Sequence, residues 1–93
     1  MEARVIKLAP RLDLGGAASL QQQLFEADAE PSVIDAQDVI AVDTSCLQLL
    51  CAFVRATTAV GHPVMWRDVT PALRDSARRL GLADVLGLPK SGV

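Results

Sequence analysis

Hydrophobic residues divide this chain into short apolar runs that alternate with longer amphipathic segments. The short runs are rich in Val, Ile and Leu and predict strands at residues 4–8, 32–36, 39–42 and 64–66. Apolar residues at helical spacing predict three helices, at about 17–27, at about 45–60, and from 71 to about 80. A further apolar stretch at 82–88 predicts a short turn that packs back, and residues 90–93 are expected to be frayed.

Proline and glycine residues support these boundaries. Pro10 ends the first strand because proline cannot donate to a sheet ladder, and Leu12 to Gly16 has the composition of a loop. Thr70-Pro71 combines a capping hydroxyl with proline at the first helical position, which predicts a helix start. Gly81 stands where a left-handed C-terminal cap is expected.

The alternation of strands and helices predicts the order β-α-β-α-β-α. Such an order implies right-handed crossovers and a largely parallel sheet. We therefore expect one α/β domain over residues 1–93, with a mostly parallel or mixed sheet of four to five strands. Three main helices and the short C-terminal turn complete this expected fold.

Composition and charge narrow the functional classes. The sequence is 51% hydrophobic but holds one Trp, two Phe and no Tyr, so a core must come from aliphatic side chains. Nine basic and eleven acidic residues give a net charge of −2, which argues against a nucleic-acid partner. The one basic cluster, Arg74, Arg78 and Arg79, is interpreted as a solvated helix face.

Neither a signal peptide nor a membrane-spanning segment is expected. The first twelve residues are charged, and no apolar run approaches the ~18 residues that span a bilayer. We expect a cytoplasmic protein without direct membrane insertion. Cys46 and Cys51 point in different directions on one predicted helix, so we expect buried, reduced thiols and no metal site.

The sequence gives little evidence of a catalytic site. His62 is the only histidine and lies at the far end of the helix that Ser45 begins, roughly 20 Å away at 1.5 Å per residue. A Ser–His or Cys–His pair is thus not expected. Asp35, Asp38 and Asp43 could suggest a carboxylate cluster, but Asp35 and Asp43 lie at or near strand ends, where polar residues are needed in any case. Gly15-Gly16 lacks the remainder of a phosphate-binding loop. We predict a protein that is not an enzyme and has no cofactor or metal.

The junction at residues 39–50 is the most informative stretch. An apolar run ends at Asp43, and Thr44 and Ser45 then open an apolar helix. Asp, Ser and Thr are preferred capping residues, so one interpretation is an ordinary helix cap. The alternative is a regulatory hydroxyl, since a phosphate is also stabilised at a positively polarised helix start.

The helix after this junction has an unusual polar side. At 100° per residue, one narrow stripe of small and weakly polar residues is expected to be exposed: Ser45, Gln48, Ala52, Arg55 and Ala59. Small exposed residues permit close approach of another protein, although ordinary surface can have this composition. Phosphorylation of Ser45 would add roughly −1.5 to −2 charges at the edge of the stripe.

The sequence resembles a STAS domain, the fold shared by anti-sigma-factor antagonists and the cytoplasmic tails of sulfate transporters. The resemblance rests on residues 32–47, an apolar strand ending in Asp, a polar break, and then Asp43-Thr44-Ser45-Cys46-Leu47. Leu12-Asp13, Gly61 to Val64 and Leu80 to Leu86 also fit the family pattern. Cys46 stands where the family has glycine, Pro10 stands in another glycine position, and the N-terminus is short for the family's opening strand pair.

This resemblance implies a regulatory protein-interaction module. In the antagonists, the serine at the position of Ser45 is phosphorylated by a partner kinase of the histidine-kinase-like ATPase type, which is the anti-sigma factor. Other small STAS proteins bind the ATPase subunit of lipid-transport ABC complexes and have threonine at the position of Thr44, and others act in chemotaxis or stress signalling. The implied phosphorylation site is Ser45, with Thr44 as the alternative.

We accordingly predict a partner-binding surface at the start and along one side of the central helix. Its predicted members are Asp43, Thr44, Ser45, Cys46, Gln48, Ala52 and Arg55. The leading hypothesis is that phosphorylation of Ser45 controls partner binding, either by recruiting a basic partner or by repelling an acidic one; the resemblance to the antagonists implies release. The second is a constitutive subunit of a transporter ATPase, with Thr44 as a packing or capping contact.

Overall fold

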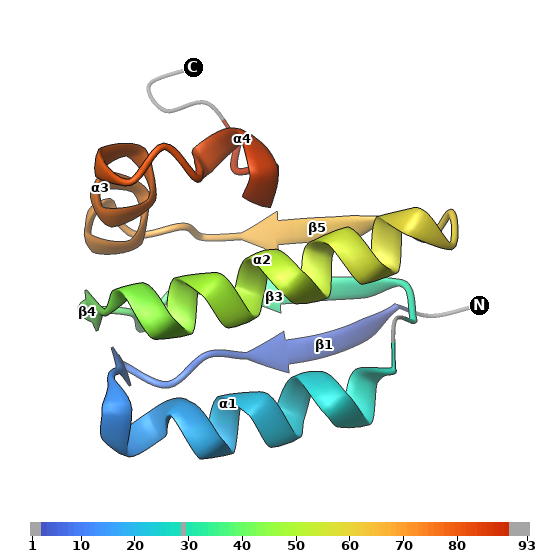
Figure 1. The fold of residues 1–93 in the computed structure, drawn as a ribbon, viewed down its shortest axis with the longest axis horizontal. Coiled ribbons are helices and arrows are strands. Elements are labelled where there is room, and N and C mark those ends of the chain that lie inside the picture. The colour runs from blue at the N-terminus through green and yellow to red at the C-terminus, as the bar shows by residue number, and fades with distance from the viewer. Residues whose placement is uncertain (1–2, 29, 90–93) are drawn as a thin grey trace.

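The computed structural model describes residues 3–28 and 30–89. It contains five strands and four helices in these residues (Figure 1). Their bounds are β1 Arg4–Lys7, β2 Arg11–Leu12, α1 Leu14–Ala27, β3 Ser32–Asp35, β4 Ala41–Val42, α2 Thr44–Ala59, β5 Val64–Arg67, α3 Pro71–Arg79 and α4 Ala83–Leu86. The predicted alternation of strands and helices and the short C-terminal turn, now α4, are confirmed.

The strands form two small parallel sheets. One has the order β1-β3-β5, and the other pairs β2 with β4. The predicted α/β class and mostly parallel pairing are confirmed, but the strands do not form one continuous ladder. Pro10 separates β1 from β2, and its carbonyl accepts bonds from Ile40 at 2.8 Å and Ala41 at 3.2 Å. The second sheet is thus a displaced continuation of the β1–β3 pair.

The register of the first sheet separates a helix-facing side from an open side. Ile6, Ile34 and Trp66 stand in one cross-strand row, and the first two are at most 3% exposed. In the next row, Val5 and Met65 are more than half exposed. Because neighbouring residues on a strand point to opposite faces, the helices cover one side of this sheet. Figure 1 shows α2 crossing in front of β3 and α1 running alongside β1.

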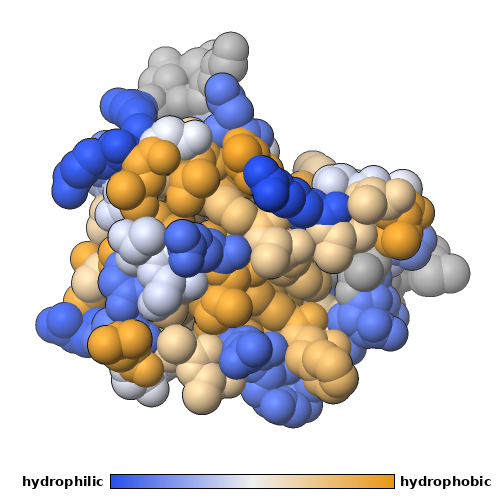
Figure 2. All heavy atoms as spheres, in the orientation of Figure 1, coloured by the Kyte–Doolittle hydropathy of each residue, from blue (hydrophilic) through white to orange (hydrophobic). Residues whose placement is uncertain are grey.

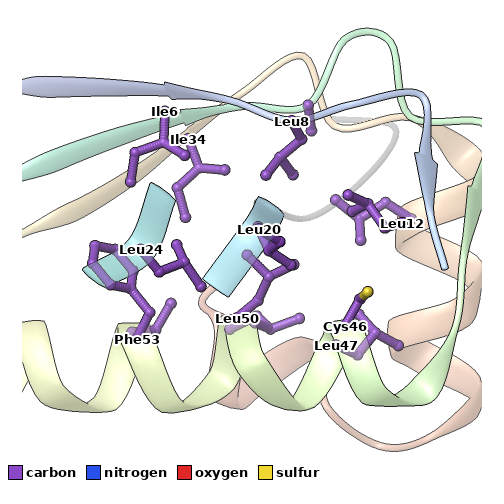
Figure 3. Close-up of a cluster of buried hydrophobic side chains, with 14 of the residues drawn as sticks. Ile6, Leu8, Leu12, Leu20, Leu24, Ile34, Cys46, Leu47, Leu50 and Phe53 are labelled. Atoms are coloured by element: carbon purple, nitrogen blue, oxygen red, sulfur yellow. The ribbon is translucent and has the colours of Figure 1, made fainter. Parts of the chain in front are cut away.

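The core lies between this sheet and the two long helices. Figure 3 shows Ile6 and Ile34 pointing from the strands, and Leu8 from the segment after β1, toward side chains of α1 and α2. The helices contribute Leu20, Leu24, Cys46, Leu47, Leu50 and Phe53, all buried. Trp66 also donates from Nε1 to the carbonyl of Leu86 at 2.8 Å, so β5 holds α4 in place. As the composition required, the core is mainly aliphatic.

Most predicted helix boundaries agree with the structure, but α1 does not. It begins at Leu14 rather than near Ala17, because Asp13 caps it and the glycine pair forms its first turn instead of a loop. Thr70 caps α3 by accepting from the Leu73 N–H at 3.4 Å, as predicted. Gly81 has a φ of 71°, the left-handed conformation expected there. The predicted frayed segment at 90–93 lies outside the described residues.

Candidate functional site

The start of α2 is held beside the start of α1, because the short strands that precede these helices pair with each other. β4 pairs with β2, placing Val42 beside Leu12, and the Asp43 N–H then donates to the Leu12 carbonyl at 2.8 Å. Asp43 is the N-cap, with an extended φ of −101° and ψ of 171°. Its Oδ1 accepts from the Cys46 N–H at 3.1 Å, satisfying one of the otherwise unpaired donors of the first turn. The predicted capping role of Asp43 is therefore present.

Ser45 is bound to the same carboxylate oxygen. Its Oγ donates to Asp43 Oδ1 at 2.7 Å. This bond, followed by the bond from the Cys46 N–H, lowers the pKa of Asp43 below its ordinary value, because both donors stabilise the ionised form. Asp43 is hence a carboxylate at neutral pH, and the side chain of Ser45 is held against it at the surface.

Cys46 does not lie on the surface where the predicted partner site was placed. Its side chain is fully buried, and Figure 3 shows its sulfur pointing from α2 toward Leu12. The thiol donates to the Asp13 carbonyl at 3.6 Å. Burial raises the pKa of this thiol, so it stays protonated at neutral pH. Cys46 therefore packs the two helix starts together, and its side chain is not beside Ser45 on the exposed side.

The predicted stripe on α2 is exposed along its length. Ser45, Gln48, Ala52, Arg55 and Ala59 are all solvent-accessible, as expected. The exposed side is wider than predicted near the C-terminal end, where Ala56 and Thr58 are also exposed. Cys51 is buried, as predicted, and forms no disulfide with the other described cysteine. Burial raises the pKa of its thiol.

Residues from the C-terminal part of the chain lie along one edge of this stripe. A groove of about 280 Å³ lies between α2 and the α4 segment, lined by Gln48, Cys51, Ala52, Arg55, Leu82 and Val85. Figure 2 shows hydrophobic atoms exposed on this side of the molecule, between α2 and the segment containing α3 and α4. Leu82 and Val85 were predicted only as a packing tail. Their proximity to α2 depends on the position of α3 and α4 relative to the rest of the fold. The local sequence does not indicate that position.

A second hollow, of about 210 Å³, adjoins the start of α2. We call it the α2–α3 cleft; its lining residues are Val42, Asp43, Thr44, Leu47, Ser76, Arg79 and Leu80. Thr44 thus faces α3, whereas the Ser45 hydroxyl is bound to Asp43. Arg79 belongs to the cluster predicted as a solvated helix face and is exposed, but its position in this cleft was not predicted.

Other candidate chemical groups lie apart from this site. Asp35 accepts from the Gln37 N–H at 3.1 Å and lies 3.9 Å from Arg67, while Asp38 pairs with Lys7 at 3.6 Å. The described residues contain no group of three potential metal ligands. Among those same residues, no helix is both long enough and apolar enough to cross a bilayer.

The fold and the capped helix start define a small α/β domain built from parallel β-α units. A family model described as "Mlab, STAS domain" matches residues 1–88 of the 93-residue chain. The chain belongs to the STAS domain family, as the resemblance predicted, and the match extends over its whole described core. STAS domains are regulatory and protein-interaction modules, and this is the functional class of the chain. No curated protein matches the sequence.

Proposed function

We propose that this domain binds a partner protein through the start and exposed side of α2, and that phosphorylation of Ser45 controls the binding. The proposed surface consists of Asp43, Thr44, Ser45, Gln48, Ala52 and Arg55. Cys46 is left out because its side chain is buried. The observation that supports the proposal most strongly is the exposed Ser45 hydroxyl held at 2.7 Å from the N-cap carboxylate of α2.

The proposed switch follows from the chemistry of that hydrogen bond. Transfer of a phosphoryl group to Ser45 Oγ removes the proton that Asp43 accepts and adds roughly −1.5 to −2 charges beside an ionised carboxylate. The two anions repel each other, so the phosphate turns outward over the partner surface or the Asp43 cap is weakened. Either response changes the shape and charge of the surface that the partner contacts.

The proposed partner is an intracellular ATPase, and two kinds fit. A Ser/Thr kinase of the histidine-kinase-like type, as in anti-sigma factors, would both bind this surface and phosphorylate Ser45. A transporter ATPase subunit would bind it constitutively, with Thr44 as a contact. The second candidate is supported by the threonine at position 44, the residue that the small STAS subunits of transporter ATPases have at this position according to the family resemblance.

Substitutions on two helices test the proposed surface. Ala52→Arg places a long charged side chain in the middle of the exposed stripe, and Ala18→Arg makes the same change on the exposed side of α1. Tagged proteins are used to capture partners from native lysate, with mass spectrometry as the readout. Ala52→Arg is expected to lose an ATPase that the parent and Ala18→Arg both retain. Equal capture of the ATPase by the parent and both variants would refute the proposed partner surface on α2.

Ser45 variants distinguish the switch from the constitutive subunit. For a switch, Ser45→Asp lowers partner binding at least tenfold while Ser45→Ala retains it, and phosphate is found on Ser45 after co-expression with the captured kinase. For a constitutive transporter subunit, both Ser45 variants bind as the parent does and Thr44→Ala weakens the complex. Absence of phosphate together with equal binding by the Ser45 variants would exclude the switch.

A further inference from the structure

We infer that this domain forms a weak homodimer in which the α1 helices of two copies pack antiparallel. The contact surface is an exposed stripe that we call the α1 seam; it consists of Leu14, Ala18, Gln21 and Phe25. This surface is separate from the proposed partner surface, whose residues lie at the start and along the exposed side of α2.

Helix α1 carries two stripes with coiled-coil spacing, and only one of them is used inside the domain. Residues 17, 20, 24 and 27 face the core: Leu20, Leu24 and Ala27 are buried, and Ala17 packs against them. The members of the α1 seam are also separated by steps of four and three residues, so they lie within about 60° of one another around the helix. A narrow seam with this spacing is typical of a surface that packs along a second helix.

The ends of the α1 seam are the two most exposed large hydrophobic side chains in the part of the chain that the structure describes. Leu14 is 81% exposed and Phe25 is 79% exposed, whereas the other large hydrophobic side chains at the surface are between 47% and 62% exposed. Figure 2 shows hydrophobic surface at both ends of α1, along the lower edge of the view, with polar surface between them. Because both side chains lie on one stripe, a single helix can cover them together.

A second copy of α1 matches the seam in the size of its side chains. When two α1 helices run antiparallel about a two-fold axis between residues 19 and 20, Leu14 of each copy lies level with Phe25 of the other. Ala18 then lies level with Gln21 of the other copy. The large side chains meet at the two ends, and the small Ala18 leaves room at the centre for the longer Gln21. Reciprocal contact of this kind defines a two-fold interface.

The side chain of Gln21 is available for a contact across the two-fold axis. Gln22 Nε2 donates to Glu26 at 3.3 Å, and Gln23 Nε2 donates to the Lys7 carbonyl at 3.2 Å. Within residues 3–28 and 30–89, the Gln21 amide forms no such bond. In the antiparallel register the two Gln21 residues lie about 4.5 Å apart along the helix axis. An amide side chain both donates and accepts, so the two can pair with each other at the centre of the interface.

Charge favours a second copy over a membrane as the occupant of the seam. The only charged residue of α1 is Glu26, which lies outside the seam and accepts from Gln22. Two copies therefore meet without like charges in the contact, and antiparallel packing places opposite ends of the two helix dipoles together. Helices that lie on membranes carry Lys and Arg beside their apolar side, and α1 has neither.

The size of the contact determines its strength. Helix α1 has 14 residues, and one side of it supplies far fewer than the about 20–30 residues that each partner contributes to a stable interface. The dimer accordingly belongs to the weak, concentration-dependent class. We expect half of the chains to be associated at a protein concentration of roughly 100 µM.

Analytical ultracentrifugation of the full chain, from about 10 µM to about 1 mM, measures this association. Ala18→Arg places a charge in the centre of the seam, and Ser19→Arg is the matched control at the neighbouring exposed position outside it. Ala18→Arg should weaken the dimer at least about tenfold, because two unpaired like charges would be buried together. Ser19→Arg should associate as the parent does.

Two cysteine variants test the antiparallel register. Leu14→Cys and Phe25→Cys are oxidised with oxidised glutathione, separately and as a mixture, and the products are identified by mass spectrometry. Positions 14 and 25 lie level across the axis, whereas like positions lie about 16 Å apart along it. A disulfide is expected between the two different variants and not within either variant alone. The native Cys46 and Cys51 are buried.

A parent that stays monomeric at about 1 mM would overturn the dimer. Equal weakening by Ala18→Arg and Ser19→Arg would also overturn it, and a disulfide within Leu14→Cys alone would refute the antiparallel register. If the parent is monomeric and Ala18→Arg loses the captured ATPase, or if the monomer binds phosphatidylcholine vesicles, the seam contacts that partner or a membrane instead. Association that is lost in Ala18→Arg supports the dimer even if Ala52→Arg leaves partner capture unchanged.

Discussion

Helices α1 and α2 begin with the same architecture and different chemistry. Each follows a two-residue strand, and these strands pair with each other. Each is capped by an aspartate whose Oδ1 accepts from the N–H three residues later, Asp13 from Gly16 at 3.3 Å and Asp43 from Cys46 at 3.1 Å. The two starts are also in contact, since the Cys46 thiol donates to the Asp13 carbonyl.

The side chains that follow the two caps differ at every matched position. After Asp13 come Leu14, Gly15, Gly16 and Ala17; after Asp43 come Thr44, Ser45, Cys46 and Leu47. Leu14 is 81% exposed and bears no group that can be modified, whereas the matched Thr44 bears a hydroxyl. A similar extended N-cap thus supports a passive helix cap in α1 and a candidate regulatory site in α2. The difference lies in the side chains rather than in the fold.

The largest expected contrast concerns the fourth residue after each cap. Leu47 is fully buried, so Leu47→Ala should lower the free energy of unfolding by about 2–5 kcal/mol through lost burial and a residual cavity. At the matched position, Ala17→Gly should cost only about 1 kcal/mol, mainly through helix propensity. Urea unfolding followed by circular dichroism measures both. Equal losses would show that the two helix starts are anchored to the core to the same extent.

A smaller effect is expected on the pH dependence of stability, when the parent is compared with a variant of the Asp43 cap of α2. The pKa of Asp43 is lower in the folded state, so its ionised form contributes stability above the unfolded-state pKa. That contribution is lost as the pH falls through the lowered folded-state pKa. Asp43→Asn keeps an acceptor for the Cys46 N–H but cannot titrate, so its stability should fall less than that of the parent between about pH 5 and pH 3. Urea unfolding at each pH measures the difference.

A control variant ties this pH dependence to its cause. Ser45→Ala removes the donor that contributes most to lowering the pKa of Asp43 and leaves the Cys46 N–H in place. The NMR titration of Asp43 should accordingly move back toward the ordinary aspartate value in Ser45→Ala, while Thr44→Ala leaves it unchanged. An unchanged titration in Ser45→Ala would mean that the serine hydroxyl does not stabilise the carboxylate.

Features set by interactions between near neighbours in the sequence were predicted more accurately than features set by distant residues. Strand Ser32–Asp35 and the Thr70-Pro71 helix start were predictable because apolar spacing and capping act between near neighbours. The start of α1 was mispredicted because Gly15-Gly16 favours a turn unless a cap is formed, and here Asp13 forms it. Local signals therefore locate elements well and their first turns less well.

Features of the site that depend on distant residues could not be predicted. Cys46 points inward because β2 and β4 pair and bring the Asp13 carbonyl to its thiol. Arg79 lies beside Thr44 because α3 follows β5, on the other side of β3 from β1, and returns along the β4 end of α2. No periodicity in the sequence encodes either approach. The exposed stripe of α2 was predictable because helical spacing alone determines it.

The smallest expected effect comes from giving α1 the hydrogen bond of α2. In Gly15→Ser, the new hydroxyl occupies the position that Ser45 has in α2, and a Cβ at Gly15 would lie 3.4 Å from Asp13 Oδ1, an ordinary contact. Propensity alone makes serine about 0.5 kcal/mol less favourable than alanine at a helix position. A hydrogen bond to Asp13 contributes about 0.5–1.5 kcal/mol. Gly15→Ser should therefore be at least as stable as Gly15→Ala by urea unfolding, and the advantage should vanish when Asp13→Ala is added. If serine instead stays about 0.5 kcal/mol below alanine in both backgrounds, the Ser45–Asp43 bond depends on more than the capped turn that the two helices share.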